Sequence, residues 1–310
     1  MLSYILTRLI WLVPTLLAMS LITFILMHMV PGSPLDLEPE RNPLPPDVRE
    51  QMAKNYGLDK PLAVQYLIFL KNAVQGDFGV SYLYKTREVT DIIKEGLPKS
   101  LLLGTLAMGF AIVGGLALGI IAAMNQNGAG DYLASILAML AISLPSFVLA
   151  VFAIVIFTFW LGWLPTGGWS DTNPKFWILP ALVLGLGPLA VIARYTRSSI
   201  VEVIGSDYVR TARAKGLREQ RVVIVHVVKN ALIPVLTIMG PLFAAVATGS
   251  YFVEAIFRVP GIGRFFVLSM INRDYSMIMA IILLYGAVLA VMNLVVDLLY
   301  AWVDPRIRYS

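Results

Sequence analysis

The chain contains no cysteine and only two histidines among its 310 residues. The absence of cysteine excludes disulfides, cysteine metal sites and cysteine nucleophiles. Neither His28 nor His226 has a carboxylate at metal-ligand spacing, so we expect no metal site and interpret His28 as a residue at the end of a membrane span. The patterns GxxxxGK(S/T), HExxH and GxSxG are also missing. Their absence excludes an ATP-binding P-loop, a zinc-protease helix and a hydrolase nucleophile elbow.

Charged residues are scarce as well, at 14% of the chain, whereas a soluble domain carries about 25%. Hydrophobic residues make up 58% of the sequence, which indicates an integral membrane protein. The net charge of +5 would suggest a nucleic-acid partner in a soluble protein. In a membrane protein, basic cytoplasmic loops explain such a charge, so we expect a lipid bilayer and no nucleic acid around this chain.

Six apolar runs are long enough to cross a bilayer, which takes about 20 residues in a helix. The runs are Leu9–Val30, Leu101–Met124, Leu133–Trp160, Phe176–Ala193, Ala231–Tyr251 and Met277–Val303. They predict an all-α integral membrane protein with six transmembrane helices, the first of them uncleaved. Proline inside a helix removes a backbone donor, so kinks are expected at Pro145, Pro180 and Pro188. The second run carries Gly104, Gly114, Gly115 and Gly119, which favour close packing of helix backbones.

A long polar segment, Leu35–Lys99, separates the first two runs. It contains proline-rich turns at Pro43–Pro46 and helix-like pieces at Pro46–Asn55 and Pro61–Val74. A loop of about 60 residues without structure is unusual, so the segment is predicted to form a small ordered subdomain. Two interpretations stay open, a spacer and a contact surface for an external partner.

Six spans place both termini on one side of the membrane, and the distribution of charge predicts which side. Residues Arg194–Lys229 carry eight lysines and arginines against three acids, and the tail carries Arg306 and Arg308 against Asp304. Short loops rich in lysine and arginine remain cytoplasmic. The termini and this basic loop are therefore predicted to be cytoplasmic, with Leu35–Lys99 outside.

The most unusual stretch is the basic loop itself, Asp207–Pro234. Gly216 can end one helix there and allow another to start. One face of the first helix carries Val209, Ala212 and Gly216. In the second helix, helical spacing relates Val222, Val225 and either Val228 or Lys229. One interpretation is a loop that only orients the protein in the membrane. The other, which the small-residue face favours, is a helical hairpin that docks on a partner protein.

The residues Tyr208–Leu217, YVRTARAKGL, resemble the EAA loop of type I ABC importer permeases, in the form found in dipeptide and oligopeptide permeases. The family core of two small residues, three positions and a glycine corresponds to Thr211 and Ala212, then Arg213–Lys215, then Gly216. Two positions depart from the general motif. Arg210 replaces its glutamate, and His226–Lys229 replaces a later Ile-x-Leu-Pro, with proline only at Pro234. The resemblance extends from the first span to Asp304–Arg306.

The resemblance implies a MetI-like permease fold, with residues 1–99 forming the first helix and an extracytoplasmic loop region, and 100–310 forming the permease domain. It implies a coupling loop at 197–229 whose ATPase contact consists of Asp207, Tyr208, Val209, Arg210, Thr211, Ala212, Arg213, Ala214, Lys215 and Gly216. In this hypothesis the Ala212/Gly216 face packs into a cleft on an ATPase, with basic side chains at the rim. A larger side chain at Gly216 is expected to clash at the helix junction or at that contact.

The resemblance further implies a place in an assembly. The partners would be a second homologous permease, two ABC ATPases that bind ATP and magnesium, and an extracytoplasmic substrate-binding protein. The chain itself would bind no cofactor and would not be an enzyme. Its location would be the cell (inner) membrane of a bacterium or archaeon. The implied substrates are dipeptides or oligopeptides, with nickel, glutathione or an oligosaccharide as alternatives.

Asp297 is the one acid well inside a predicted span. Carboxylates in the membrane are costly and mark functional positions by default, but this one lies near the cytoplasmic end. Pairing with a basic loop residue and a role in the transport pathway both remain open. Two other classes of protein are a secondary transporter and an intramembrane enzyme. No repeat relates the two halves, and no pair of catalytic residues lies in the spans, so both are disfavoured.

The predicted topology can be tested by cysteine labelling, since the chain has no cysteine of its own. Ser310→Cys and Lys215→Cys should react with a membrane-impermeant maleimide only after the membrane is opened. Labelling of both positions from outside intact cells would show that the orientation is wrong.

Overall fold

The computed structural model describes residues 2–32, 50–51, 53–54, 57–84 and 87–303. The predicted turns at Pro43–Pro46, most of the helix-like piece Pro46–Asn55 and the tail from Asp304 lie outside the described residues. The second predicted piece, Pro61–Val74, is helix α3 (Leu62–Val74). Part of the ordered outer segment was therefore predicted correctly.

The described chain is helical, with one isolated antiparallel bridge between Val80 and Glu88. Its elements in order are α1 (Leu2–Met29), α3, α4 (Val89–Met124), α5 (Ala129–Ser143), α6 (Ser146–Ile154), η1 (Val155–Trp160), α7 (Lys175–Ile204), α8 (Asp207–Ala214), α9 (Glu219–Arg221), η2 (Val222–Val228), α10 (Lys229–Ala247), α11 (Tyr251–Ile256), α12 (Gly263–Ile271) and α13 (Tyr275–Val303). Within the described residues, five stretches are long and apolar enough to cross a membrane, or six if the bent pair α5 and α6–η1 counts as one.

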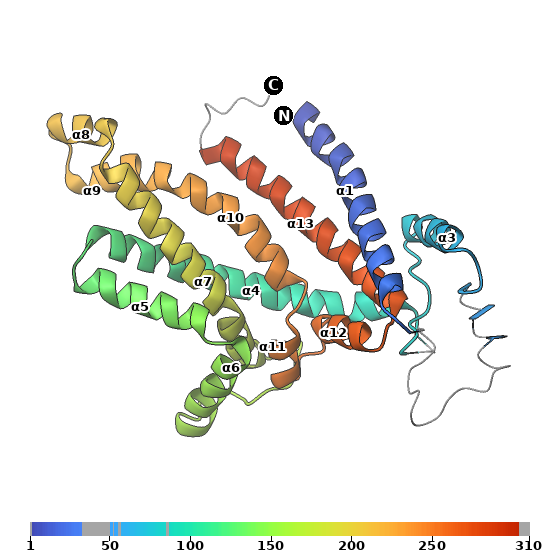
Figure 1. Ribbon diagram of the computed structural model, residues 1–310. Helices are drawn as coiled ribbons and strands as arrows, with labels where there is room; N and C mark the ends of the chain where they lie inside the picture. The colour runs from blue at the N-terminus through green and yellow to red at the C-terminus, as the bar shows by residue number, and fades with distance from the viewer. Residues whose placement is uncertain (1, 33–49, 52, 55–56, 85–86, 304–310) are drawn as a thin grey trace.

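The long helices form an elongated bundle (Figure 1). The start of α1, the end of α13 and the α8–α9 hairpin lie at one end of it. Helices α3 and α12 lie toward the opposite end, where α4 begins. We refer to these as the α8 end and the α3 end.

The third predicted span is not one kinked helix, as expected from Pro145, but two helices that meet at 108°. Proline cannot donate the backbone bond that would continue α5, and the residue before it avoids helical geometry. Leu144 is accordingly extended, with φ −86° and ψ 129°. Pro145 is the N-cap residue of α6. By contrast, α7 runs without interruption through Pro180 and Pro188. The kinks at these two residues stay predictions.

Helices α4 and α7 extend by more than ten residues beyond the apolar runs that predicted them. Helix α4 begins at Val89 rather than Leu101, and α7 continues to Ile204 beyond the predicted end at Ala193. Both extensions contain charged residues that a hydropathy pattern assigns to loops. A helix satisfies its own backbone donors and acceptors, so it can continue out of the apolar layer without a partner.

Helices α4 and α7 pack closely along their length because glycines remove the side chains between them. A Cβ added at Gly115 would lie 2.8 Å from the Cβ of Ile192, and one at Gly119 would lie 2.5 Å from the Cβ of Thr196. Gly104 meets α10 in the same way, 2.5 Å from the Cα of Ala247. The predicted packing role of these glycines is confirmed.

Charged and polar side chains tie the ends of the helices together. At the α8 end, the Arg197 guanidinium on α7 donates two hydrogen bonds of 2.5 and 2.6 Å to Asp131 on α5. At the α3 end, the buried Asp274 caps α13 by accepting a bond from the Met277 amide at 3.2 Å. Asp274 also accepts a bond from the Ser81 hydroxyl, which fastens the outer segment to α13.

The glycine packing predicts a contrast within α4. Gly119→Ala should lower the thermal unfolding temperature of the detergent-solubilised protein, because its methyl group would lie 2.6 Å from the Ala193 carbonyl oxygen. Overpacking of this kind costs about 1–3 kcal/mol. Gly109→Ala on the same helix is the control, since nothing lies within 4 Å of its added Cβ. Equal effects of the two substitutions would contradict the close approach of α4 and α7.

Candidate functional site

The α8–α9 hairpin is the most polar helical feature of the α8 end, and its turn is built by Gly216. Helix α8 ends with Gly216 at φ +75°, a conformation that favours glycine. The Gly216 amide donates to the Arg213 carbonyl at 2.9 Å, and the Leu217 amide donates to the Ala212 carbonyl at 3.4 Å. This pattern is a Schellman cap, which satisfies helix carbonyls and reverses the chain. The predicted helical hairpin is therefore confirmed.

The inner face of α8 is fixed on the rest of the chain. Val209 is 0% exposed and Ala212 is 5% exposed. They belong to one apolar cluster with Ala123 of α4, Ile200 of α7, Val222 and Val227 of η2, and Ala231 of α10. The small-residue face was expected to enter a cleft on a partner. That expectation is wrong for Val209 and Ala212, because their side chains are buried inside this chain.

The second helix of the hairpin departs from the predicted spacing. Val222 and Val227 are buried under α8, whereas Val225 is 47% exposed. The reason is that η2 is π-helical, and a π-helix brings residues i and i+5 onto one face. An α-helical spacing of three and four therefore predicted Val222 correctly but selected Val225 in place of Val227. Such π-helical turns occur frequently at functional sites.

The outer face of α8 is exposed and mostly polar. Tyr208 is 45% exposed, and its hydroxyl accepts a bond of 3.3 Å from the Asn230 side chain. Arg213 pairs with Glu219 across the hairpin at 2.6 Å, and this hydrogen bond raises the pKa of Arg213 above its usual value. Arg210 lies 3.6 Å from Asp207. Thr211, Ala214 and Lys215 complete the exposed face.

Gly216 is constrained by its backbone rather than by crowding. A Cβ added there would meet no atom within 4 Å. The expected clash at the helix junction is therefore wrong within this chain. What remains is the positive φ, which costs an L-residue roughly 1–2 kcal/mol.

Asp297 forms an ion pair with a residue of another long helix and not with a residue of the basic loop. Its carboxylate lies 2.9 Å from the guanidinium of Arg8 on α1. Asp297 comes from α13, so the pair links the first and last spans near the α8 end. Hydropathy patterns treat each span by itself and could not indicate this partner. The pair Asp131–Arg197 was missed for the same reason.

A further buried carboxylate, Glu254 of α11, was not predicted as a site. It is 3% exposed, accepts a bond of 2.7 Å from the Ser100 hydroxyl and accepts another of 2.8 Å from the Gly263 amide. These bonds join α4, α11 and the start of α12. Gly249 and Gly261 were the available signal, because a Cβ added to either would lie within 2.6 Å of a Glu254 carboxylate oxygen. Among the described residues, no group of three histidines, cysteines or acids could hold a metal ion.

Comparisons with known proteins identify the family. Residues 115–309 match the model of the binding-protein-dependent transport system inner membrane component, and residues 1–104 match the N-terminal membrane component of the same systems. The oligopeptide transport system permease protein OppB of Escherichia coli K12 is 44% identical over 309 residues, covering 100% of both chains. The dipeptide transport system permease protein DppB of Bacillus subtilis is 43% identical, over 95% of this chain and 94% of its own. The glutathione transport system permease protein GsiC of Shigella flexneri is 45% identical over the full length of both.

Solved structures agree on the fold. The MetNI methionine ABC transporter in inward-facing conformations has a chain that matches with a TM-score of 0.57 and 17% identity, covering 69% of this chain and 96% of that one. An amino acid ABC transporter matches with a TM-score of 0.51 and 18% identity, covering 68% and 93%. Together with the family match, the fold shows that the chain belongs to the inner membrane components of binding-protein-dependent transport systems.

Proposed function

We propose that this protein is a permease subunit of an ABC importer and forms part of the translocation pathway for dipeptides or oligopeptides. The full-length identity to OppB and DppB supports this substrate class. The similar identity to GsiC keeps glutathione, itself a small peptide, as the second candidate. The chain is the membrane component of the system and not its ATPase, and it contains no P-loop.

In this proposal the importer contains a second homologous permease, two ATPase subunits that bind ATP and magnesium, and an extracytoplasmic binding protein. The α8 end is cytoplasmic, in the inner membrane of a bacterium or archaeon, and the α3 end faces outward. The concentration of lysine and arginine between Arg194 and Lys229 supports this orientation. The segment around α3 would receive substrate from the binding protein.

The coupling mechanism follows from the two faces of α8. Its outer face, with Tyr208, Thr211 and Lys215 at helical spacing, would lie against an ATPase subunit. Its inner face is buried against α7, η2 and α10. A displacement of α8 by the ATPase would therefore move the long helices on either side of the hairpin. Coupling of this kind requires that α8 contacts two ATPase states differently.

Charge on the outer face is expected to contribute little on its own. Arg210 and Asp207 are 72% and 98% exposed in their side chains. Exposed ion pairs contribute about 0.2–1 kcal/mol, because water and salt screen them. The shape of α8 and its turn should therefore matter more for coupling than any single basic residue.

Substitutions at Gly216 separate backbone conformation from side-chain size. Gly216→Asn should retain most uptake, because asparagine tolerates positive φ, whereas Gly216→Val should lose most of it, because a β-branched residue does not. Lys215→Ala should retain most uptake. Uptake and substrate-stimulated ATP hydrolysis would be measured in membranes that contain the whole importer, with co-purification as the check on assembly. Normal transport by Gly216→Val would show that coupling does not depend on the geometry of the hairpin.

A further inference from the structure

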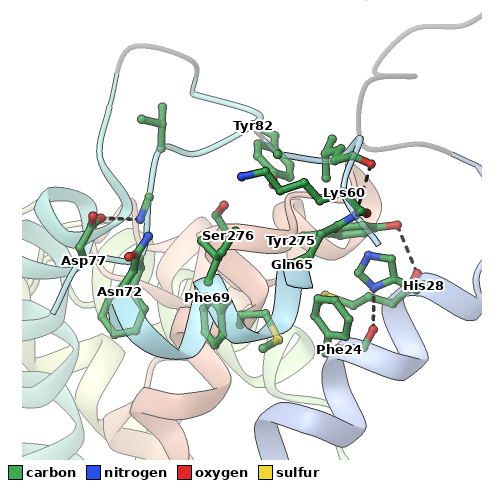
Figure 2. Close-up of a pocket in the computed structure, with 18 of the residues that line it drawn as sticks. Phe24, His28, Lys60, Gln65, Phe69, Asn72, Asp77, Tyr82, Tyr275 and Ser276 are labelled. Atoms are coloured by element: carbon green, nitrogen blue, oxygen red, sulfur yellow. Dashed lines mark hydrogen bonds between the residues drawn. The ribbon is translucent and has the colours of Figure 1, made fainter. Parts of the chain in front are cut away.

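A cavity of about 570 Å³ lies at the α3 end, away from the coupling hairpin (Figure 2). Its walls come from the end of α1, from α3, from the segment 77–82, from the start of α13 and from the residues before α3, which are Lys54, Gly57, Leu58 and Lys60. Its size is within the range of small-molecule sites, about 300–1,000 Å³. Nothing in the coupling mechanism accounts for it.

The walls of this cavity are fastened to each other by hydrogen bonds. The Tyr66 hydroxyl on α3 and the Ser20 hydroxyl on α1 lie 2.8 Å apart. The Tyr275 hydroxyl at the start of α13 donates to the Met27 carbonyl on α1 at 3.2 Å. Because three helices are fixed to one another here, the cavity is formed before any ligand arrives, which lowers the cost of ordering on binding.

One face of α3 lines the cavity and has polar residues at its ends. Gln65, Ile68, Phe69 and Asn72 fall on that face at helical spacing. The two middle residues are apolar, and Phe24 of α1 and Tyr82 contribute aromatic rings to the same lining. The cavity therefore has an apolar middle between two polar ends.

The end near Gln65 is cationic. The Gln65 amide donates to the carbonyls of Leu58 at 3.2 Å and Lys60 at 2.8 Å, which holds Lys60 at this end. The Lys60 ammonium forms no ion pair with any residue that the structure describes. His28 lines the same end and donates from Nδ1 to the Phe24 carbonyl at 2.8 Å. Figure 2 shows Lys60, Gln65 and His28 on one side of the view.

The end near Asn72 is anionic. The Asp77 amide donates to the Asn72 carbonyl at 3.0 Å, which places Asp77 at this end of α3. One oxygen of the Asp77 carboxylate accepts a bond of 2.8 Å from the Gly79 amide. Figure 2 shows Asp77 and Asn72 on the side opposite to Lys60.

The length of the α3 face that lines the cavity is sufficient for a short peptide. Gln65 and Asn72 are seven residues apart, so the α3 face between them is about 10 Å long at 1.5 Å per residue. An extended dipeptide measures about 7 Å between its termini, so it fits along this face. A phosphate or another pure anion would place like charge beside Asp77, which costs free energy.

We propose that this cavity is a binding subsite for a zwitterionic dipeptide. The peptide carboxylate lies at Lys60, its ammonium group lies at Asp77, and its side chains lie among the aromatic residues between them. The identification of the ligand as a peptide rests on the proposed function. The subsite would hold substrate at the outer end of the permease, beside spans one and six.

A cysteine placed in the cavity would report occupancy without any transport step. Ser276 lines the cavity at the start of α13, and the chain has no other cysteine. In the assembled importer with cysteine-free partner subunits, alanyl-phenylalanine should slow maleimide labelling of Ser276→Cys. The same dipeptide with an amidated carboxyl terminus or an acetylated amino terminus should protect poorly. Thr172→Cys on the exposed loop before α7 is the control and should be labelled at one rate throughout.

Charge substitutions then test which terminus of the peptide binds at each end of the cavity. Lys60→Gln should raise the half-protecting concentration of the free dipeptide about fivefold and leave that of the amidated peptide unchanged. Asp77→Asn should show the reciprocal pattern with the acetylated peptide. Lys175→Gln, an exposed lysine outside the cavity, should change neither.

Two results would overturn the subsite. One is unchanged labelling of Ser276→Cys by the dipeptide in an importer that takes the dipeptide up. The other is protection that Lys60→Gln and Asp77→Asn both leave intact. Failure of the proposed function gives a different result, because the wild-type importer would then take up no peptide when supplied with its binding protein.

Discussion

The burial of Val209 and Ala212 is the contact on which the proposed coupling depends. These two side chains hold α8 against Ile200 of α7 and against Val222 and Val227 of η2. Without that cluster, α8 would be a short polar helix of eight residues, and isolated helices of this length are marginal in water. With it, α8 is a fixed projection of two long helices, and its polar outer face remains open for a partner.

The packing of the rest of the bundle allows it to transmit a displacement along its length. Helix α7 is 30 residues long and packs on α4 through glycines that leave no space between the backbones. The ion pair between Asp131 and Arg197 ties α5 to α7 near the hairpin. Close packing makes such a body stiff, so motion at one end reaches the other rather than being absorbed. Glu254 joins α11 to α12 through the Gly263 amide and to α4 through the Ser100 hydroxyl. At the α3 end, Asp274 joins the start of α13 to the outer segment through the Ser81 hydroxyl.

Structural features that produce a short-period pattern in the sequence were predicted well. The apolar runs gave the helices that cross the membrane, the glycines of α4 gave its packing face, and the basic run around Gly216 gave the hairpin. The predictions that failed concerned features that depend on contacts between distant segments or on local departures from the α-helix. The π-helical turn moved burial from Val225 to Val227, and Pro145 broke a span that hydropathy shows as continuous. The partner of Asp297 is Arg8, 289 positions away, and the cavity beside Lys60 needs three helices to exist at all.

The most direct measurement is a distance between spin labels on the two arms of the hairpin. Thr211→Cys on α8 and Val225→Cys on η2 are both exposed, and the chain supplies no other cysteine. In an importer with cysteine-free partner subunits, we expect the same Thr211–Val225 distance distribution in the nucleotide-free and ATP-bound states. A second pair, Thr211→Cys with Thr172→Cys near the other end of α7, should also keep its distance, because α7 and α8 move as one body. A Thr211–Val225 distance that shifts with nucleotide would show that α8 moves independently of the spans, and would contradict coupling through its buried face.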